Sequence, residues 1–181
     1  MNASFMQHAA HILRQGGVVA YATESCFGLG CDPRNPSAVK RLLNLKQRPM
    51  KKGLILIAAD VDQLRPYCAE FPPQVLAAWP GPHTWLLPAK KNAPRWIMGN
   101  HARIALRVTA HRQAAALCRG AGMAIVSTSA NRSGEVPARS YRETVRRFHG
   151  KVDYILSGYP GGLPRPTAIT DAGTGKSIRA G

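Results

Sequence analysis

Short apolar runs alternate with amphipathic segments along the chain. Three runs are almost free of polar residues and directly follow a glycine, at 18–23, 54–59 and 123–126. Runs of this length with glycine at their start predict buried strands. Residues 103–108 alternate charged and apolar side chains, imperfectly, as a half-buried strand does. Shorter strands are expected at 85–87, 152–156, 167–171 and 177–179.

A second set of segments has the periodicity and the end signals of helices. Residues 5–15 place apolar side chains on one face and end at Gly16-Gly17. Asn35-Pro36 predicts an N-cap with proline in the first turn, and the helix should run to Leu45. Ser140 and Glu143 form a capping-box pattern, which predicts a helix over 141–148. Shorter helices are expected after Asp62, around 75–78 and over 114–119, whereas 23–32, 90–102 and 158–166 are expected to be loops.

The alternation of strands and helices predicts an α/β fold with a mixed sheet and flanking helices. A chain of 181 residues fits one domain that buries a substantial core. No internal repeat or linker divides it, so a single domain over residues 1–181 is expected.

The charge balance points to an anionic partner. Lys and Arg number 25 against 9 Asp and Glu, a formal net charge of +16. Such an excess favours nucleic acid, or nucleotide and phosphate substrates. The densest cluster is Lys46-Gln47-Arg48-Pro49-Met50-Lys51-Lys52-Gly53, immediately before the run 54–59. Cations fixed at a strand entrance suit a polyphosphate, although a solvated positive loop is an equally simple interpretation.

The cysteines and the apolar runs indicate where the protein works. Cys26, Cys31, Cys68 and Cys118 show no C-x-x-C pair and no zinc-ligand spacing. No signal peptide is expected, and no apolar run approaches the roughly 20 residues that a membrane span needs. We therefore expect a cytoplasmic protein with free thiols and no membrane contact.

Two common nucleotide signatures are incomplete. Gly175-Lys176-Ser177 resembles the end of a Walker A loop, but Thr170 stands where its first glycine should be. Gly28-Leu29-Gly30 lacks the third glycine of a dinucleotide fingerprint, since Pro33 occupies that position. If this protein uses ATP, it therefore uses neither loop.

Two polar features remain open on the residues alone. The cluster 127–131 (Ser-Thr-Ser-Ala-Asn) follows a buried strand and could hold a phosphate or carboxylate, or could be a capped polar turn. Ser129 lacks the surroundings of a hydrolase nucleophile. Glu24 could hold a metal, hold a substrate amine, or cap a turn.

Several motifs, taken in chain order, resemble one family. Thr23-Glu24 followed by Phe27-Gly28-Leu29-Gly30 resembles the P-T-E-T-x-Y-G-L signature of the YrdC/TsaC threonylcarbamoyl-AMP synthases. Lys46-x-Arg48-Pro49 and Ser129-x-Asn131 resemble that family's K-x-R and S-x-N pair. The remaining blocks also occur in the family's order: Trp79-Pro80-Gly81-Pro82-x-Thr84, Ala105-x-Arg107-Val108, Thr167-Ala168-Ile169-Thr170-Asp171 and Ile178-Arg179-Ala180-Gly181. The resemblance covers nearly the whole chain and implies the short, single-domain bacterial form.

The resemblance implies a fold and a reaction. The fold would be a twisted mixed sheet with a concave, basic face. L-Threonine, bicarbonate or CO2, and ATP would give threonylcarbamoyl-AMP and diphosphate, with Mg2+ held through the ATP phosphates and no protein metal site. Other proteins would then transfer the threonylcarbamoyl group to adenosine 37 of tRNA, so tRNA and these transfer proteins are the implied partners.

The resemblance also implies roles for individual residues. Threonine would be bound by Thr23, Arg107 and Thr167, with Arg107 on its carboxylate. Lys46 and Arg48 would be catalytic and, with Lys52, would neutralise the triphosphate. The rest of the nucleotide site would comprise Ser127, Ser129, Asn131 and Arg179.

Four positions depart from the family pattern without removing a charge. Ala22 replaces a proline, Ser25 a threonine, Phe27 a tyrosine and Thr167 a serine. The alternative function is a non-catalytic RNA-binding protein, a ribosome or RNA maturation factor, that uses its basic face. Against it, no RRM, KH or double-stranded RNA-binding signature is present.

Overall fold

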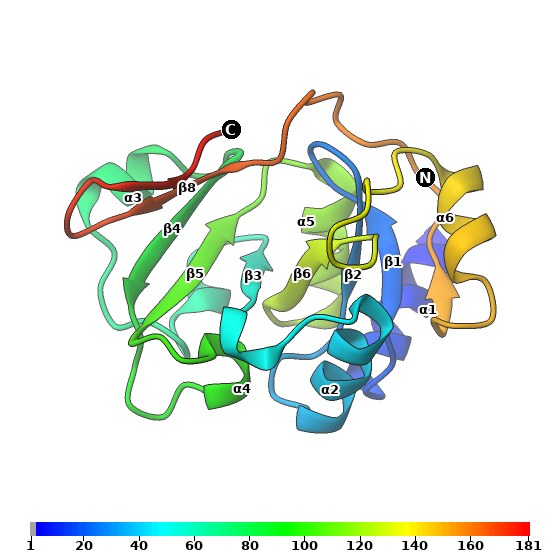
Figure 1. The fold of residues 1–181 in the computed structure, drawn as a ribbon, viewed down its shortest axis with the longest axis horizontal. Coiled ribbons are helices and arrows are strands. Elements are labelled where there is room, and N and C mark those ends of the chain that lie inside the picture. The colour runs from blue at the N-terminus through cyan, green and yellow to red at the C-terminus, as the bar shows by residue number, and fades with distance from the viewer. Residues whose placement is uncertain (1–2) are drawn as a thin grey trace.

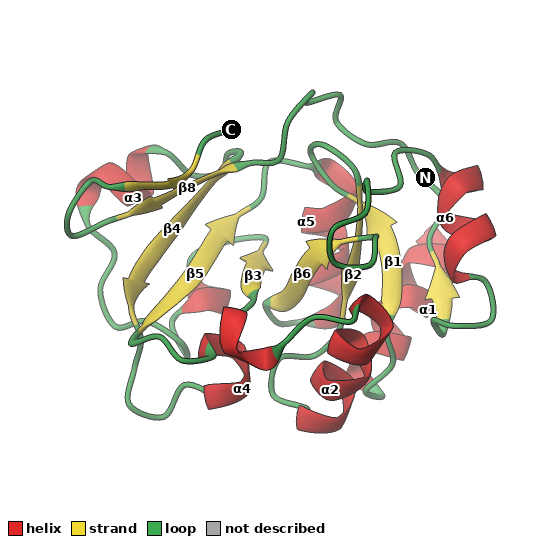
Figure 2. Ribbon diagram, viewed as in Figure 1, coloured by secondary structure: helices red, strands yellow, loops and turns green. Residues whose placement is uncertain are grey.

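A computed structural model describes residues 3–181. In this part of the chain, nine strands form one sheet in the order β7-β1-β2-β6-β3-β5-β4-β8-β9, seen as yellow arrows in Figure 2. The strands are β1 (Val19–Ala22), β2 (Phe27–Gly30), β3 (Ile55–Ala58), β4 (His83–Pro88), β5 (Arg103–Val108), β6 (Ile125–Ser129), β7 (Tyr154–Ile155), β8 (Ala168–Asp171) and β9 (Ser177–Arg179).

The sheet is mixed, as predicted. The pairs β1–β7, β3–β5 and β4–β8 are parallel, and the other neighbouring pairs are antiparallel. Helices flank it (Figure 1), so the expected α/β class is confirmed. The helices are α1 (Ala3–Arg14), α2 (Pro36–Lys46), α3 (Pro73–Ala77), α4 (Arg95–Met98), α5 (Arg112–Ala121) and α6 (Tyr141–Phe148), with 3-10 turns η1 (Met50–Lys52) and η2 (Asp62–Leu64).

The predicted caps begin their helices. The side chain of Asn35 accepts a hydrogen bond from Ala38 N at 3.0 Å and caps α2. The hydroxyl of Ser140 accepts from Glu143 N at 3.2 Å and caps α6. The Glu143 carboxylate reaches back to Arg139 N at 2.7 Å, one residue earlier than in a standard capping box.

A hydrophobic core lies on each face of the sheet, because alternate residues of each strand face opposite sides. Val19, Tyr21 and Ile57 pack with α1 and α5 in the smaller core. Their neighbours Ala20 and Leu56 belong to the larger core on the other face, which includes side chains of α2. The helices α1, α2 and α5 each bury an apolar stripe, so they are held to the sheet mainly by the hydrophobic effect.

The prediction of a loop over 23–32 is wrong in part, because β2 lies within it. Two glycines hid this strand, since glycine is a weak strand former. Their absent side chains make the pairing possible: a Cβ at Gly30 would lie 2.7 Å from Val126 O and 2.8 Å from the Tyr21 ring. β2 therefore passes closely between β1 and β6.

Other expected boundaries also change. The loop predicted over 90–102 contains the single-turn helix α4, and the helix predicted after Asp62 is only the turn η2. The third buried strand runs through Ser127 to Ser129 instead of ending at residue 126. Hydroxyl residues join this strand because it pairs with both β2 and β3 near its end. Within residues 3–181, no helix has the length and apolar character to cross a membrane.

Candidate active site

A cavity of about 750 Å³ opens on the same face of the sheet as α1 and α5, over the part that these helices do not cover. Ile57 lies in the core beneath those helices, whereas Ile55, two residues earlier on the same strand, lines the cavity. The lining draws on strands β2 to β6, β8 and β9, on the loops after β1 and before β3, and on α4. Of the predicted site residues, eight line it: Thr23, Arg48, Lys52, Arg107, Ser127, Ser129, Thr167 and Arg179.

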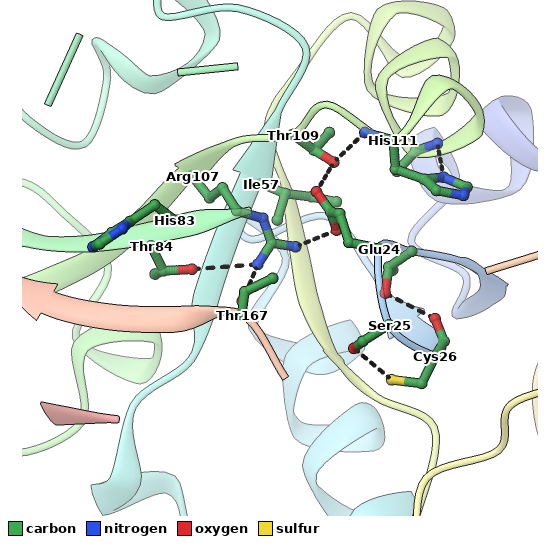
Figure 3. A network of polar contacts seen from close by, with 12 residues as sticks. Glu24, Ser25, Cys26, Ile57, His83, Thr84, Arg107, Thr109, His111 and Thr167 are labelled. Atoms are coloured by element: carbon green, nitrogen blue, oxygen red, sulfur yellow. Dashed lines mark hydrogen bonds and ion pairs between the residues drawn. The ribbon is translucent and has the colours of Figure 1, made fainter. Parts of the chain in front are cut away.

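A buried ion pair joins Arg107, which lines the cavity from β5, to Glu24 in the turn after β1. Arg107 Nη2 donates to Glu24 Oε2 at 3.1 Å, and both side chains are almost fully buried. The other carboxylate oxygen, Oε1, accepts from the Thr109 hydroxyl at 2.6 Å. Figure 3 shows Glu24 held between Arg107 and Thr109. In this structure Glu24 neutralises and orients an arginine, a role that was not among the three considered for it.

Arg107 also contacts two threonine hydroxyls. Its Nη1 donates to Thr167 Oγ1 at 2.7 Å and to Thr84 Oγ1 at 3.3 Å (Figure 3). Its Nε has no hydrogen-bond partner in the described part of the chain, although it is buried. A buried N–H without an acceptor costs about 1–3 kcal/mol, and such deficits call for a specific explanation. A ligand carboxylate at Arg107 would supply the missing acceptor.

Arg179 joins the same wall from the last strand. Its Nε and Nη2 donate to Thr167 O at 3.0 and 2.7 Å. Burial lowers the pKa of the Arg179 guanidinium, and the nearby positive charges of Arg107 and Arg48 act in the same direction. Thr167 is thus the bridge that places two arginines side by side.

The basic loop before β3 forms the opposite rim. Arg48 Nη2 donates to Gly53 O at 2.9 Å, so a backbone carbonyl of the same loop orients the Arg48 guanidinium. Burial lowers the pKa of this guanidinium, and its Nε also lacks a partner within residues 3–181. Lys52 lines the same rim and is exposed.

Like charges therefore converge on one cavity without matching anions. Arg48, Arg107 and Arg179 all line it, and only Arg107 has a carboxylate partner. Partly buried charges repel more strongly than exposed ones because solvent screens them less. An anionic ligand would relieve this repulsion, so the cavity is built to bind one.

Lys46 and Asn131 lie behind the cavity wall instead of lining it. The Lys46 side chain is buried, and its ammonium donates to Asn131 O at 2.7 Å and to Ser129 O. A third, longer contact reaches Asn131 Oδ1 at 3.4 Å. Burial lowers the pKa of Lys46 to about 8, and the charge of Arg48 acts in the same direction. In this structure Lys46 fastens the end of α2 to the end of β6.

The Asn131 side chain serves the adjoining loop. Its Nδ2 donates to Arg132 O at 2.7 Å and to Glu135 O at 2.8 Å. Both motif residues thus shape the segment that follows β6, and Ser127 and Ser129 of that strand remain open to the cavity.

The turn after β1 is held from within. Thr23 Oγ1 donates to Cys26 O at 2.8 Å, and Thr23 N bonds to the same carbonyl at 2.9 Å. A glycine- and proline-rich strap crosses this turn, with Gly161 N donating to Thr23 O and Leu163 N to Glu24 O. A Cβ at Gly161 would lie 3.0 Å from Glu24 O, so the strap approaches closely because that residue is glycine.

Sequence reasoning missed several lining residues. Ser25 and Cys26 line the cavity, and burial raises the pKa of the Cys26 thiol. Arg103 also lines it, paired with Asp171 at 2.7 Å. Arg139 enters from the loop before α6, where its Nη2 donates to Pro164 O. The alternation within β5 placed Arg103 and Arg107 on one face, but no local signal marked Arg139.

Much of the remaining lining is apolar. Side chains from β3, β4, β8, β9 and α4 contribute: Ile55, Leu86, Ile97, Met98, Ile169 and Ile178. Pockets that combine an apolar surface with a few fixed polar groups suit ligands with a flat or aliphatic part as well as charges. A nucleotide has both.

The carboxylates near the cavity are already engaged. Glu24 is bonded to Arg107 and Thr109, and Asp171 to Arg103 and to two backbone N–H groups. Within residues 3–181 no group of three His, Cys, Asp or Glu side chains is placed to hold a metal ion. The residues present therefore fit phosphate and carboxylate groups and do not fit a cation directly.

The fold and the cavity together define a class: an α/β protein with a deep basic cavity for an anionic, nucleotide-sized ligand. The family follows from the sequence. The Sua5/YciO/YrdC family model, whose description is "Telomere recombination", matches residues 11–181, and this chain belongs to that family.

Curated relatives are similar over almost their whole length. A threonylcarbamoyl-AMP synthase of Halorhodospira halophila is 54% identical over 178 residues, which is 96% of this chain and 93% of the relative. A threonylcarbamoyl-AMP synthase of Methylobacillus flagellatus is 53% identical over 173 residues, covering 93% of this chain and 96% of the relative.

Solved structures share the fold. P. abyssi Sua5, solved in complex with L-threonine, is 32% identical with a TM-score of 0.88 over 95% of this chain. This chain spans only 52% of that longer protein. E. coli YciO is 27% identical with a TM-score of 0.85, covering 98% of this chain and 89% of that one.

Proposed function

We propose that this protein is an L-threonylcarbamoyladenylate synthase and performs the first step of tRNA N6-threonylcarbamoyladenosine modification. The observation that carries the proposal is the convergence of Arg48, Arg107 and Arg179 on one cavity that also has an apolar lining. Curated relatives named for this activity, at about half identity over nearly full length, support the same reaction.

The chemistry needs positioning and charge stabilisation more than a nucleophile from the protein. The threonine nitrogen attacks CO2 and loses a proton, giving a carbamate. A carbamate oxygen then attacks the α-phosphorus of ATP, the bond to the β-phosphate oxygen breaks, and diphosphate leaves. Because all the reacting groups come from the substrates, the protein accelerates the reaction by holding them in line and stabilising anionic charge.

Threonine is assigned to the wall that contains Arg107. The guanidinium is fixed by Glu24 and Thr167 and has an unpaired Nε, so it is pre-oriented for a carboxylate. Thr23 and Thr167 flank this position. P. abyssi Sua5 was solved with L-threonine, which supports an amino-acid site in this fold.

The triphosphate is assigned to the opposite rim. Arg48 and Lys52 stand on the basic loop, and Ser127 and Ser129 offer hydroxyl groups. Arg179 adds a second guanidinium from the wall that contains Arg107. Arg48 is our choice for the charge that develops at the α-phosphate. Lys46 and Asn131 contribute indirectly, by holding the end of β6 in place.

Mg2+ is proposed to enter with ATP. Its ligands would be phosphate oxygens and water, because the nearby carboxylates are engaged by arginines. When bound, the ion would neutralise part of the phosphate charge. We propose further that the protein works in the cytoplasm and passes its product to the proteins that transfer the threonylcarbamoyl group to tRNA.

The direct test is substrate-dependent ATP turnover. The purified protein is incubated with ATP, Mg2+, L-threonine and bicarbonate, and each component is omitted in turn. Diphosphate and AMP, the latter from the labile adenylate, should appear only when threonine and bicarbonate are both present. The proposal would be overturned if ATP were consumed at the same rate without threonine, or if no ATP were consumed at all.

A further inference from the structure

The hydroxyl group of Tyr21 lies beside the active-site cavity and has no ordinary hydrogen bond. Tyr21 stands on β1 and is fully buried. Its hydroxyl oxygen has no hydrogen-bond partner within bonding distance among residues 3–181. Buried polar atoms in native proteins nearly always have a partner, so each exception needs an explanation. The proposed function gives this hydroxyl no role.

Two glycines of β2 make room for hydroxyl groups from both neighbouring strands. β2 lies between β1 and β6 in the sheet (Figure 2). Tyr21 pairs with Gly28, and its ring leans over Gly30: a Cβ there would lie 2.8 Å from the ring and 3.3 Å from the hydroxyl oxygen. From the other side, Ser127 Oγ would lie 3.6 Å from a Cβ at Gly28. The two glycines are two residues apart and share one face, so both hydroxyl groups lie above the same strand.

Tyr21 and Ser127 are close enough to influence each other. Burial raises the pKa of the Tyr21 hydroxyl, and the contact with the Ser127 side chain is the largest influence that opposes this rise. A hydroxyl with a raised pKa keeps its proton at neutral pH. A phenol is a stronger hydrogen-bond donor and a weaker acceptor than an alcohol, because its ring withdraws charge from the oxygen. A bond between the two side chains therefore runs from the Tyr21 proton to Ser127 Oγ.

We propose that Tyr21 is a positioning residue that makes Ser127 donate its proton into the cavity. When Ser127 Oγ accepts the Tyr21 proton, its own proton has to point toward another acceptor. Ser127 lines the cavity, so that acceptor is a ligand atom. It would be a phosphate or carboxylate oxygen, and not the amino group of a substrate. This role rests on the proposed function, which places Ser127 in the nucleotide site.

The two hydrogen bonds would reinforce each other. A ligand oxygen that accepts from Ser127 makes Oγ more negative, and Oγ is then a better acceptor for the Tyr21 proton. The buried phenol thus gains its partner when the ligand binds. Tyr21 itself touches no substrate, because it does not line the cavity.

The test removes single hydroxyl groups. Tyr21→Phe keeps the ring in the core, Ser127→Ala removes the acceptor, and a double variant combines the two. The matched control is Tyr67→Phe, because Tyr67 is also buried but lies in the core on the other face and does not line the cavity. Diphosphate release gives kcat/KM for ATP, and urea unfolding gives the stability of each variant.

Tyr21→Phe should lower kcat/KM for ATP about tenfold, the worth of one hydrogen bond. Its urea midpoint should be unchanged or higher, because a buried hydroxyl without a partner has been removed. In the Ser127→Ala background the same change should alter the rate by less than twofold, since its partner is already gone. Tyr67→Phe should leave the rate within twofold. A rate within twofold for Tyr21→Phe, or equal losses in both backgrounds, would overturn the proposal.

A second measurement needs no turnover, so it separates this proposal from the proposed function. Carbon-13 at the tyrosine Cζ gives one NMR signal per tyrosine, and Tyr21→Phe identifies the Tyr21 signal by its loss. Inorganic diphosphate or L-threonine, added singly, should shift this signal in the unmodified protein but not in Ser127→Ala. The Tyr67 signal should stay in place.

The outcomes of the two measurements are distinct. A Tyr21 signal that responds through Ser127 in a protein that does not consume ATP would refute the proposed function and leave the Tyr21–Ser127 pair as an anion-binding device. A Tyr21 signal that responds to neither compound, or that still responds in Ser127→Ala, would overturn the positioning role even if the protein forms the adenylate.

Discussion

The ammonium of Lys46 donates a hydrogen bond to the backbone carbonyl of Asn131 at 2.7 Å, behind the cavity that both residues were expected to line. The two residues lie 85 positions apart in the chain. Their contact joins the last residue of α2 to the segment that follows β6. The K-x-R and S-x-N motifs thus meet in space, because Lys46 of the first motif bonds to Ser129 and Asn131 of the second.

Lys46 should be more important for stability than its exposed neighbours on the same helix. Lys46→Met keeps most of the apolar stem but leaves two buried carbonyl oxygens without their charged donor. We expect a loss of about 2–4 kcal/mol in the free energy of unfolding, measured with urea. Lys40→Met on the exposed face should change it by less than about 0.5 kcal/mol. Equal effects would show that the buried ammonium is not a structural link.

Arg48 should matter for the reaction and not for the fold. Arg48→Ala should abolish measurable adenylate formation, a fall of at least about 10²-fold, because it removes positive charge from the developing anion. Diphosphate release reports the rate. Lys51→Ala is the control, since Lys51 lies in the same basic loop but does not line the cavity. A rate within twofold of the unmodified protein would remove Arg48 from the site.

Arg107 should control the threonine requirement. Arg107→Ala should raise the KM for threonine about tenfold or more, the worth of a charged hydrogen bond. It should also destabilise the fold by about 3–5 kcal/mol, because Glu24 would stay buried without its partner.

The double variant Glu24→Gln/Arg107→Ala separates the two effects. Removing the orphaned charge should restore much of the lost stability while the KM for threonine stays high. If the KM for threonine returned to its original value together with the stability, Arg107 would have only a structural role. A change in the ATP requirement alone would mean that the threonine and nucleotide positions are exchanged.

Asp153 should contribute stability that depends on pH. Burial acts to raise the pKa of this carboxyl, but hydrogen bonds from Arg41 and Val18 N and the charge of Arg41 outweigh it, so the pKa lies below its ordinary value. A carboxyl with a depressed folded-state pKa stabilises the protein above its unfolded pKa, near 3.9, and loses that contribution as the pH falls.

The variant Asp153→Asn should therefore be less stable than the unmodified protein at pH 7, by about 0.5–1.5 kcal/mol. The difference should disappear in acid, below about pH 3. Asp62→Asn is the matched control, because its ion pair with Arg65 is exposed and local. Chemical unfolding across pH measures both, and a difference that persists in acid would contradict the assignment.

Much of the fold could be predicted from local signals. The buried runs that became β1, β3 and β6, and the caps of α2 and α6, each depend on a few neighbouring residues, so the sequence specified them directly. β2 was missed because its two glycines are typical of a turn. Only the passage of the strand between β1 and β6 shows why a side chain is excluded there.

The candidate site, like the fold, was predictable from the sequence only in part. The chain pattern and the family resemblance identified eight residues that the structure brings to one cavity. They did not distinguish Arg48, which lines the cavity, from Lys46 two residues earlier, which is buried behind it. That difference arises because Lys46 ends a helix packed against β6, a relationship between distant segments.

The sequence by itself determined the positive charge, the order of the motifs and the residue types that can hold a carboxylate and phosphates. Only the tertiary structure decided which of those groups face the cavity, and that Glu24 is the partner of Arg107. The physical reason is that charge and hydrogen-bonding capacity belong to single residues, whereas burial and pairing depend on which distant segments the packed sheet brings together.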